Sequence, residues 1–203
     1  EEQLLPDGAH YEQSPMYHCI LLDRLLDCYN VSMNNLRFIG QEGLNERLRE
    51  KARSMLGHVA SVVYKDNTIP LLNDSAEGIA PSPTQLFAYA KRLDMDWEKL
   101  PMGACGYRKL MAGHWEAIVD VGDIKASYQP GHSHADMFNY ELRIGGKPFV
   151  IDTGISTYDK TARRQYERGT AAHNTVMIGD KNSSEVWGGF RVGRRARSEE
   201  RRV

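Results

Sequence analysis

The first hundred residues carry apolar side chains at helical spacing. Ser14-Pro15 predicts a helix start, because serine is a favoured N-cap and proline suits the first helical position. Leucines three and four residues apart continue that helix to about residue 30. A second amphipathic helix is predicted over 42–64, and Ser82-Pro83 repeats the start signal for a third. The loop between the last two is rich in turn-forming residues, and Asp74 is its candidate polar contact.

Beyond about residue 101 apolar and polar positions alternate instead, as they do in half-buried strands. The predicted strands form two hairpins, over 106–121 and 137–152, followed by single strands over 174–178 and 187–192. Short strands separated by glycine turns favour an antiparallel, sandwich-like sheet over a parallel α/β fold. We therefore predict a helical portion over 1–100 and an antiparallel β portion over 101–203.

Composition narrows the classes of partner. The 203 residues include 26 basic and 27 acidic side chains, and the formal net charge of −1 gives no support for nucleic acid or an anionic membrane as partner. No apolar run reaches transmembrane length, so membrane insertion is not expected. The polar opening EEQLLPDG contains no signal peptide, but it does not resemble a natural N-terminus either. The three cysteines form no CxxC pair and are expected to be small core residues.

Five groups that can bind a metal or move a proton gather around the second hairpin, namely His132, His134, Asp136, Asp152 and His173. Two histidines at i and i+2 of an extended chain point to the same side. A carboxylate from the returning strand and a third imidazole complete a nitrogen and oxygen set suited to zinc. We predict His134, Asp152 and His173 as ligands and leave His132 for chemistry. The alternative is a set of polar loop residues at the rim of the sheet.

Tyr17 lies in the first turn of the first predicted helix. The helix dipole favours negative charge there, and would stabilise a phenolate. The alternative is a half-buried tyrosine without a chemical role.

Four segments in order resemble one family. They are LLPDGAHYEQSPMYH, YQPGHSHADMFNYELRIGGKPFVIDTG, TAAHNTV and SEVWGGFRVGRRA, and together they resemble the heparinase II/III-like polysaccharide lyases, which include oligoalginate lyases. The resemblance implies a multidomain α and β fold: the C-terminal part of an (α/α) toroid followed by a partial antiparallel β-sandwich. It also implies β-elimination, in which a uronic acid loses its C5 proton and the bond to O4 breaks. An acidic polysaccharide or oligosaccharide would be the partner, in the periplasm or at the cell surface of a bacterium, with the cytoplasm as the alternative.

The resemblance also implies residue roles. Tyr17 matches the family's catalytic tyrosine, which protonates O4 and can act as base, and His132 matches its catalytic histidine, a base or charge stabiliser. His134, Asp152 and His173 match a structural zinc site. Tyr158 lies where some members place another active-site tyrosine, and His18, Arg168 and Asp74 are candidates for substrate binding. The family's carboxylate-neutralising Asn-His pair has no counterpart before Tyr17, so we expect the stretch alone to have little lyase activity.

Two other classes of protein stay open. The segment HSHAD matches HxHxD, which is half of the metal-binding motif of metallo-β-lactamase-like hydrolases. In those enzymes another histidine and a helix usually follow, whereas here Asp136 is followed by Met137 and a strand. A non-catalytic sugar-binding or scaffold module is the second alternative. Its sugar-stacking rings would come from the aromatic residues Tyr11, Trp97, Tyr128 and Trp187, for most of which core packing is the simpler role.

Overall fold

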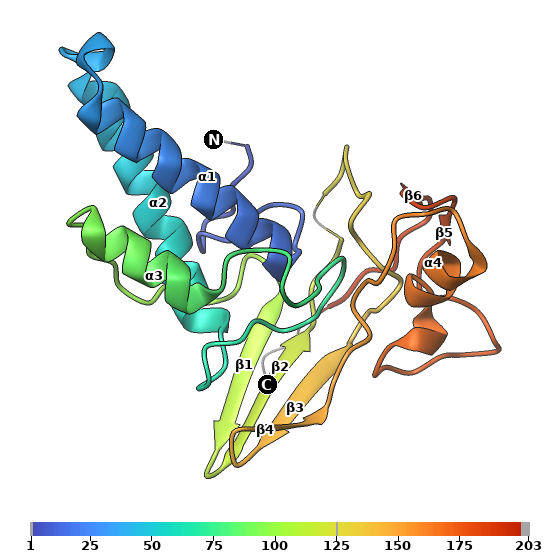
Figure 1. The fold of residues 1–203 in the computed structure, drawn as a ribbon. Helices are drawn as coiled ribbons and strands as arrows, with labels where there is room; N and C mark the ends of the chain where they lie inside the picture. The colour runs from blue at the N-terminus through green and yellow to red at the C-terminus, as the bar shows by residue number, and fades with distance from the viewer. Residues whose placement is uncertain (1, 125, 200–203) are drawn as a thin grey trace.

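The computed structural model describes residues 2–124 and 126–199 (Figure 1). The helical part contains α1 (Pro15–Asn34), a 3-10 turn η1 (Leu36–Phe38), α2 (Glu42–Val62) and α3 (Pro83–Arg92). The strands that follow are β1 (Tyr107–Ala112), β2 (Trp115–Asp120), β3 (Tyr140–Ile144) and β4 (Lys147–Val150). The last elements are α4 (Ala162–Glu167), η2 (Thr170–Ala172), β5 (Val186–Trp187) and β6 (Arg191–Val192).

Both predicted Ser-Pro helix starts are confirmed. The Ser14 side chain accepts a hydrogen bond from the Tyr17 amide at the start of α1. At α3 the Ser82 side chain accepts from the Gln85 amide and the Gln85 side chain accepts from the Ser82 amide, which makes a capping box. These caps satisfy amides that the first turn of a helix leaves without partners, so each start is specified by local sequence.

The helical core is built from the apolar faces of α1, α2 and α3, which lie side by side (Figure 1). Leu22 and Leu26 of α1, Met55 and Leu56 of α2 and Leu86 of α3 are all buried in one cluster. The predicted periodicity therefore identified the packed faces. Within the described residues, no helix is both long enough and apolar enough to cross a bilayer.

The four longer strands form an antiparallel sheet in the order β1-β2-β3-β4, and both predicted hairpins are confirmed. Strand β3 turns polar side chains toward the segment after α2. Glu141 accepts a hydrogen bond from the Tyr64 hydroxyl at 2.8 Å, and Arg143 pairs with Asp66. The opposite face carries Leu110, Trp115 and other apolar side chains that stay partly exposed. The alternation is therefore real, but in β3 the polar positions are the ones that dock on the segment after α2.

Two strand predictions for the last third of the chain are wrong, and one helix was missed. Residues 174–178 form no strand; Asn174 instead uses its side-chain amide to donate to the Ile151 carbonyl at 2.8 Å. The strand predicted over 187–192 is broken by Gly188 and Gly189, both at positive φ, into the short β5–β6 hairpin. Helix α4 was not predicted, because six residues are too few to establish a helical period.

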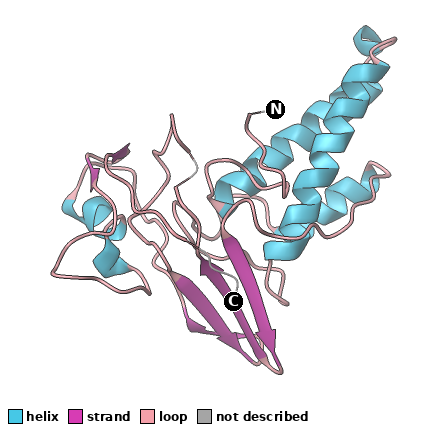
Figure 2. Cartoon of the chain, turned by 180° about the vertical axis from the view of Figure 1, so that it is seen from behind, coloured by secondary structure: helices cyan, strands magenta, loops and turns pink. Residues whose placement is uncertain are grey.

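The loop after α2 and the segment after β4 approach each other between the helical part and the C-terminal elements. Figure 2 shows the chain from behind, and both views place α1–α3 on one side of the sheet's end and α4 with the β5–β6 hairpin on the other. The loop after α2 reaches into this space, where Gly154 approaches it closely. A Cβ on Gly154 would lie 2.1 Å from the Ser75 carbonyl oxygen, and its φ is +55°. Only glycine fits this approach.

The boundary predicted near residue 101 falls between the end of α3 and the start of β1. A second hydrophobic cluster joins the two portions across it. Val62 and Leu72 on the helical side pack with Cys105, Tyr107 and Ile118 on the sheet side. The portions therefore share part of their core.

Candidate active site

A tyrosine from the helical part and a histidine from the sheet part stack on one another. The rings of Tyr17, in the first turn of α1, and His132, in the loop between β2 and β3, have centroids 3.9 Å apart at an interplanar angle of 25°. The hydroxyl of Tyr158 lies 2.8 Å from that of Tyr17. The three residues predicted to be catalytic are thus brought together, although they span 141 positions of the chain.

The two phenols of this cluster have different environments. Burial raises the pKa of Tyr158, and the hydrogen bond to Tyr17 and the charge of Asp74 raise it further. Tyr158 therefore keeps its proton and can donate it in a hydrogen bond to the Tyr17 oxygen. The Tyr17 oxygen thus lies within hydrogen-bond reach of a protonated phenol, at the N-terminal end of α1.

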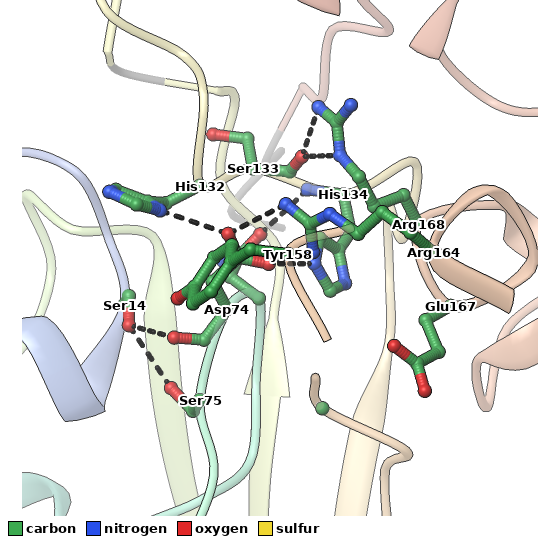
Figure 3. Close-up of polar contacts among 12 residues, drawn as sticks. Ser14, Asp74, Ser75, His132, Ser133, His134, Tyr158, Arg164, Glu167 and Arg168 are labelled. Atoms are coloured by element: carbon green, nitrogen blue, oxygen red, sulfur yellow. Dashed lines mark hydrogen bonds and ion pairs between the residues drawn. The ribbon is translucent and has the colours of Figure 1, made fainter. Parts of the chain in front are cut away.

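Asp74 is the centre of the polar network (Figure 3). Its carboxylate is fully buried and accepts from His132 Nδ1 at 2.9 Å and from His134 Nε2 at 2.7 Å. Both Nη atoms of Arg164 also donate to it, with Nη2 at 2.8 Å from Oδ2. Burial alone would raise the pKa of Asp74, but the hydrogen bonds from His132, His134 and Arg164 outweigh it and hold that pKa well below its usual range. The carboxylate is therefore ionised and fixes one nitrogen of each imidazole as a donor.

The backbone around Asp74 ties the two portions of the chain together. The Asp74 amide donates to the His132 carbonyl at 3.1 Å, and the Ser14 hydroxyl donates to the Asp74 carbonyl at 2.6 Å. The Ser75 hydroxyl accepts from the Met16 amide at 3.2 Å. The loop after α2 therefore locks the start of α1 to the histidine loop, which sets the distance between Tyr17 and His132.

Glu12 belongs to the cluster and was missed by sequence reasoning. Its Oε2 lies 3.3 Å from His132 Nε2, so that both nitrogens of this imidazole face carboxylates. Burial raises the pKa of Glu12, the charge of His132 opposes this, and the charge of Asp74 raises it again. Its position five residues before Tyr17 was the available signal, but no spacing rule marks a loop glutamate as functional.

Arg164 was also missed. Its side chain is fully buried, donates from Nε to the Gly189 carbonyl at 3.0 Å and lies over the rings of Tyr158 and Phe190. It therefore carries the contact between α4, the β5–β6 hairpin and Asp74. Nothing in the local sequence separates it from the neighbouring Arg163, which is exposed.

The residues predicted to bind substrate lie in the interior with protein partners. His18 accepts from the His10 amide at Nδ1 and lies 3.1 Å from the Met55 carbonyl at Nε2, and burial holds its pKa well below the usual value. Arg168 donates to the Ser133 carbonyl, and burial together with Arg164 lowers its pKa to about 10. Asp74, the third of these candidates, is equally buried. His18, Arg168 and Asp74 therefore hold segments of the chain in place and are not exposed at the surface.

The predicted metal ligands are adjacent but are bonded to carboxylates. His173 Nδ1 lies 2.8 Å from Asp152 Oδ2, and the rings of His134 and His173 have centroids 5.2 Å apart. His134 Nδ1, His173 Nε2 and Asp136 Oδ2 are buried without a hydrogen-bond partner. A metal-binding imidazole commonly donates one nitrogen to a carboxylate and ligates with the other, so the types of donor here are those that a divalent cation uses. Asp136, which was not among the predicted ligands, offers a further oxygen.

A second candidate metal-binding group lies elsewhere. Within the described residues, the set whose ligand atoms all lie within 4.8 Å of one another consists of Asp7, His58 and Cys105, all buried. His134, Asp152 and His173 do not meet that distance as a set. The Asp7 carboxylate already accepts from the amides of Gly103 and Cys105, at 3.1 and 2.8 Å, so it has a structural role without an ion.

Two family models match the chain. One described as "Heparinase II/III N-terminus" matches residues 1–95, and one described as "Heparinase II/III-like, C-terminal" matches residues 94–203.

Characterised relatives are longer than this chain. A heparin-sulfate lyase of Pedobacter heparinus is 24% identical over 207 residues, which is 90% of this chain and 30% of the relative. The crystal structure of heparan sulfate lyase HepC from Pedobacter heparinus has a TM-score of 0.65 at 19% identity. The matched region is 90% of this chain and 32% of the HepC chain. A crystal structure of heparinase III has a TM-score of 0.64 at 20% identity, and the matched region is 91% of this chain and 35% of the heparinase III chain. The chain thus spans about a third of each of these relatives, and the two solved structures share its fold.

Proposed function

The chain belongs to the heparinase II/III family, and we propose that it carries part of the active site of a polysaccharide lyase that cleaves a uronate-containing substrate by β-elimination. The observation that supports this most directly is the stacking of Tyr17 on His132 at 3.9 Å, with the Tyr158 hydroxyl bonded to Tyr17. These groups come from both portions of the chain. The helical portion would be the end of an (α/α) toroid and the sheet the start of a β-sandwich.

The proposed chemistry needs a base for the C5 proton and an acid for the leaving oxygen O4. In β-elimination the C5–H and C4–O4 bonds break, a C4=C5 double bond forms, and O4 gains a proton. Tyr17 would supply the proton to O4 and is also placed to accept one from C5, with Tyr158 donating to its oxygen. His132, held by carboxylates at both nitrogens, would stabilise the charge that develops on the uronate.

Asp74 and Arg164 would position rather than react. Both are fully buried, so neither can touch a substrate. Asp74 orients His132 through Nδ1, and Arg164 neutralises Asp74 while it packs on the Tyr158 ring. Neutralisation of the substrate carboxylate would fall to groups outside this stretch, so we expect the stretch alone to have little activity.

A zinc ion, if bound by His134, Asp152 and His173, would supply a structural cross-link between the histidine loop, the end of β4 and the segment after α4. His134 shares Asp74 with His132, so that cross-link would also restrain the catalytic imidazole.

Exchange of Tyr17 for phenylalanine tests the proposal in the full-length parent enzyme. Tyr17→Phe removes the hydroxyl and keeps the ring that stacks on His132. We expect loss of at least about a thousandfold in elimination, because both proton transfers depend on this oxygen. The assay is ultraviolet absorption of the unsaturated uronate, measured on heparan-type polymers and on alginate. The control is Tyr166→Phe, since Tyr166 is 58% exposed. Equal activity of the two variants would contradict the proposal.

A non-catalytic sugar-binding module is the second candidate, because Tyr128 and Trp187 are 60% and 51% exposed. The same variant separates the two functions, since Tyr17→Phe would leave sugar binding nearly intact. The other aromatic residues considered do not support it: Tyr11 is buried and Trp97 stacks on Phe87 in the helical core. A hydrolase of the HxHxD type has less support, because His132 and His134 both turn to Asp74.

A further inference from the structure

The buried cluster of Asp7, His58 and Cys105 lies where three parts of the chain meet. Asp7 is in the loop before α1, His58 is in α2, and Cys105 is in the segment before β1. The three residues are buried, and their ligand atoms all lie within 4.8 Å of one another. Carboxylate oxygen, imidazole nitrogen and thiolate sulfur are the ligands that zinc takes from proteins. The cluster therefore offers three zinc ligands of three different kinds.

The carboxylate and the imidazole of the cluster each keep a lone pair for a metal. Oδ2 of Asp7 accepts from the amides of Gly103 and Cys105. Oδ1 accepts from the Ala9 amide at the longer distance of 3.3 Å, and a second lone pair of this oxygen remains. His58 Nδ1 lies 3.2 Å from the Asp7 carbonyl oxygen, which only accepts, so Nδ1 carries the hydrogen and Nε2 keeps a lone pair. A carbonyl behind one nitrogen is a common support of a metal-binding imidazole.

The thiol supplies its sulfur by giving up a proton. The Cys105 side chain is hydrogen-bonded to the Asp7 carboxylate. An entering cation takes the place of this shared proton: the S–H bond breaks, bonds form from the metal to sulfur and oxygen, and the proton leaves to solvent. Tetrahedral zinc, with bonds of about 2.0–2.3 Å, holds its ligand atoms about 3.3–3.6 Å apart, so shifts of at most about 1.5 Å close the set. The ion has a short way in, because Pro101 is exposed and residues 102–104 are half-buried.

A cavity of about 10 Å³ adjoins the cluster and is lined by His58, Cys105 and His10. A volume of about 10–15 Å³ accommodates one water molecule. His10 is 6% exposed, and its Nε2 lies 3.1 Å from Gln3 Oε1, which only accepts, so Nδ1 is an acceptor. Within the part of the chain that the structure describes, this buried Nδ1 has no hydrogen-bond partner. A metal-bound water in the cavity would complete four ligands and donate to His10 Nδ1.

We propose that Asp7, His58 and Cys105 bind one zinc ion, with a water molecule in the cavity as the fourth ligand. Thiolate and imidazole favour zinc over magnesium and calcium, which take oxygen ligands. The ion joins the loop before α1, helix α2 and the segment that leads into β1, so it fastens the helical portion to the sheet. This site is independent of the proposed lyase chemistry and of the ligand set that contains His173.

Cobalt in place of zinc tests the sulfur ligand directly. The 203-residue chain with His173→Ala, which lacks a ligand of the other proposed site, is freed of metal by a chelator and titrated with cobalt(II). Thiolate bound to cobalt gives an intense charge-transfer band in the near ultraviolet, whereas imidazole and carboxylate ligands give none. We expect a band that saturates at one equivalent of cobalt and disappears when zinc is added.

Variants in the same His173→Ala background identify the ligands. Cys105→Ser should lose the band, and His58→Gln should weaken cobalt binding at least tenfold. The control Cys28→Ser removes an exposed thiol and should change neither the band nor the affinity. Zinc should raise the melting temperature of the background and not that of its Cys105→Ser form. If Cys105→Ser does not fold by circular dichroism, X-ray absorption of zinc in the background should still show one sulfur neighbour at about 2.3 Å.

Four outcomes would overturn the inference: no thiolate band in the background, a band that survives Cys105→Ser, an equal loss in Cys28→Ser, or a zinc spectrum without sulfur. Failure here leaves the proposed function intact if Tyr17→Phe still abolishes elimination in the parent enzyme. Conversely, intact elimination in Tyr17→Phe would remove the catalytic proposal while the zinc site at Cys105 stood.

Discussion

Exchange of Asp74 for asparagine would remove a buried charge and keep the shape of the side chain. In the folded protein Asp74 and Arg164 are both 0% exposed, and two imidazoles donate to the same carboxylate. Asparagine leaves the Arg164 guanidinium in the interior without a counter-charge. Loss of one partner of a buried ion pair costs about 3–5 kcal/mol, and hydrogen bonds to a charged group are worth about 1.5–3 kcal/mol each. We therefore expect Asp74→Asn to lower the free energy of unfolding by about 3–5 kcal/mol.

That loss is large against the roughly 5–15 kcal/mol that stabilises a typical domain. Urea unfolding followed by far-ultraviolet circular dichroism measures it, provided that the dependence on urea concentration keeps its slope. The control is Glu50→Gln, because Glu50 pairs with Lys51 at 3.0 Å and is 64% exposed. Exposed pairs contribute at most about 1 kcal/mol.

A double-mutant cycle separates the ion pair from the rest of the network. Arg164→Met fills similar volume without charge, so the combination with Asp74→Asn removes both members of the pair. We expect a coupling of at least about 2 kcal/mol, since the double variant lacks the unpaired buried guanidinium. The reasoning is refuted if Asp74→Asn costs less than about 1 kcal/mol, or if the two changes add without coupling.

Three further predictions concern stability. Burial lowers the pKa of His10 from 6.5 to about 4. As the pH is lowered, the unfolded chain therefore takes up this proton before the folded chain does. The free energy of unfolding should fall by about 1.4 kcal/mol for each pH unit of acidification between pH 6.5 and about pH 4. Urea titrations at several pH values should show a smaller slope for His10→Asn. Gly154→Ala should lower the melting temperature more than Gly145→Ala, because both glycines have positive φ but only at Gly154 would a Cβ meet the Ser75 carbonyl. Equal losses in the two variants would contradict the close approach at Gly154. Zinc should raise the melting temperature of the chain more than that of His173→Ala, and an equal rise in both would contradict the proposed ligand.

Local features of the fold were predictable from the sequence. The helix starts at Ser14 and Ser82 depend on a cap within three residues of each amide, and both are where the sequence places them. The two long hairpins depend on alternation and a glycine turn, and both form. Prediction failed where the same residue types serve another purpose, as when Asn174 binds carbonyls at the end of the sheet instead of extending a strand.

The sequence by itself determined which reactive side chains are present and which elements carry them, because capping and periodicity act over a few neighbouring residues. Tyr17 could be placed in the first turn of a helix and His132 beside a hairpin in this way, whereas the candidate role of Tyr158 came only from the resemblance to the family. Only the tertiary structure decided that Asp74, rather than Asp152, receives the two histidines at 132 and 134, and that a buried arginine 90 residues away completes the network. Such contacts depend on how the helical part docks on the sheet, and the burial that makes them strong exists only after docking.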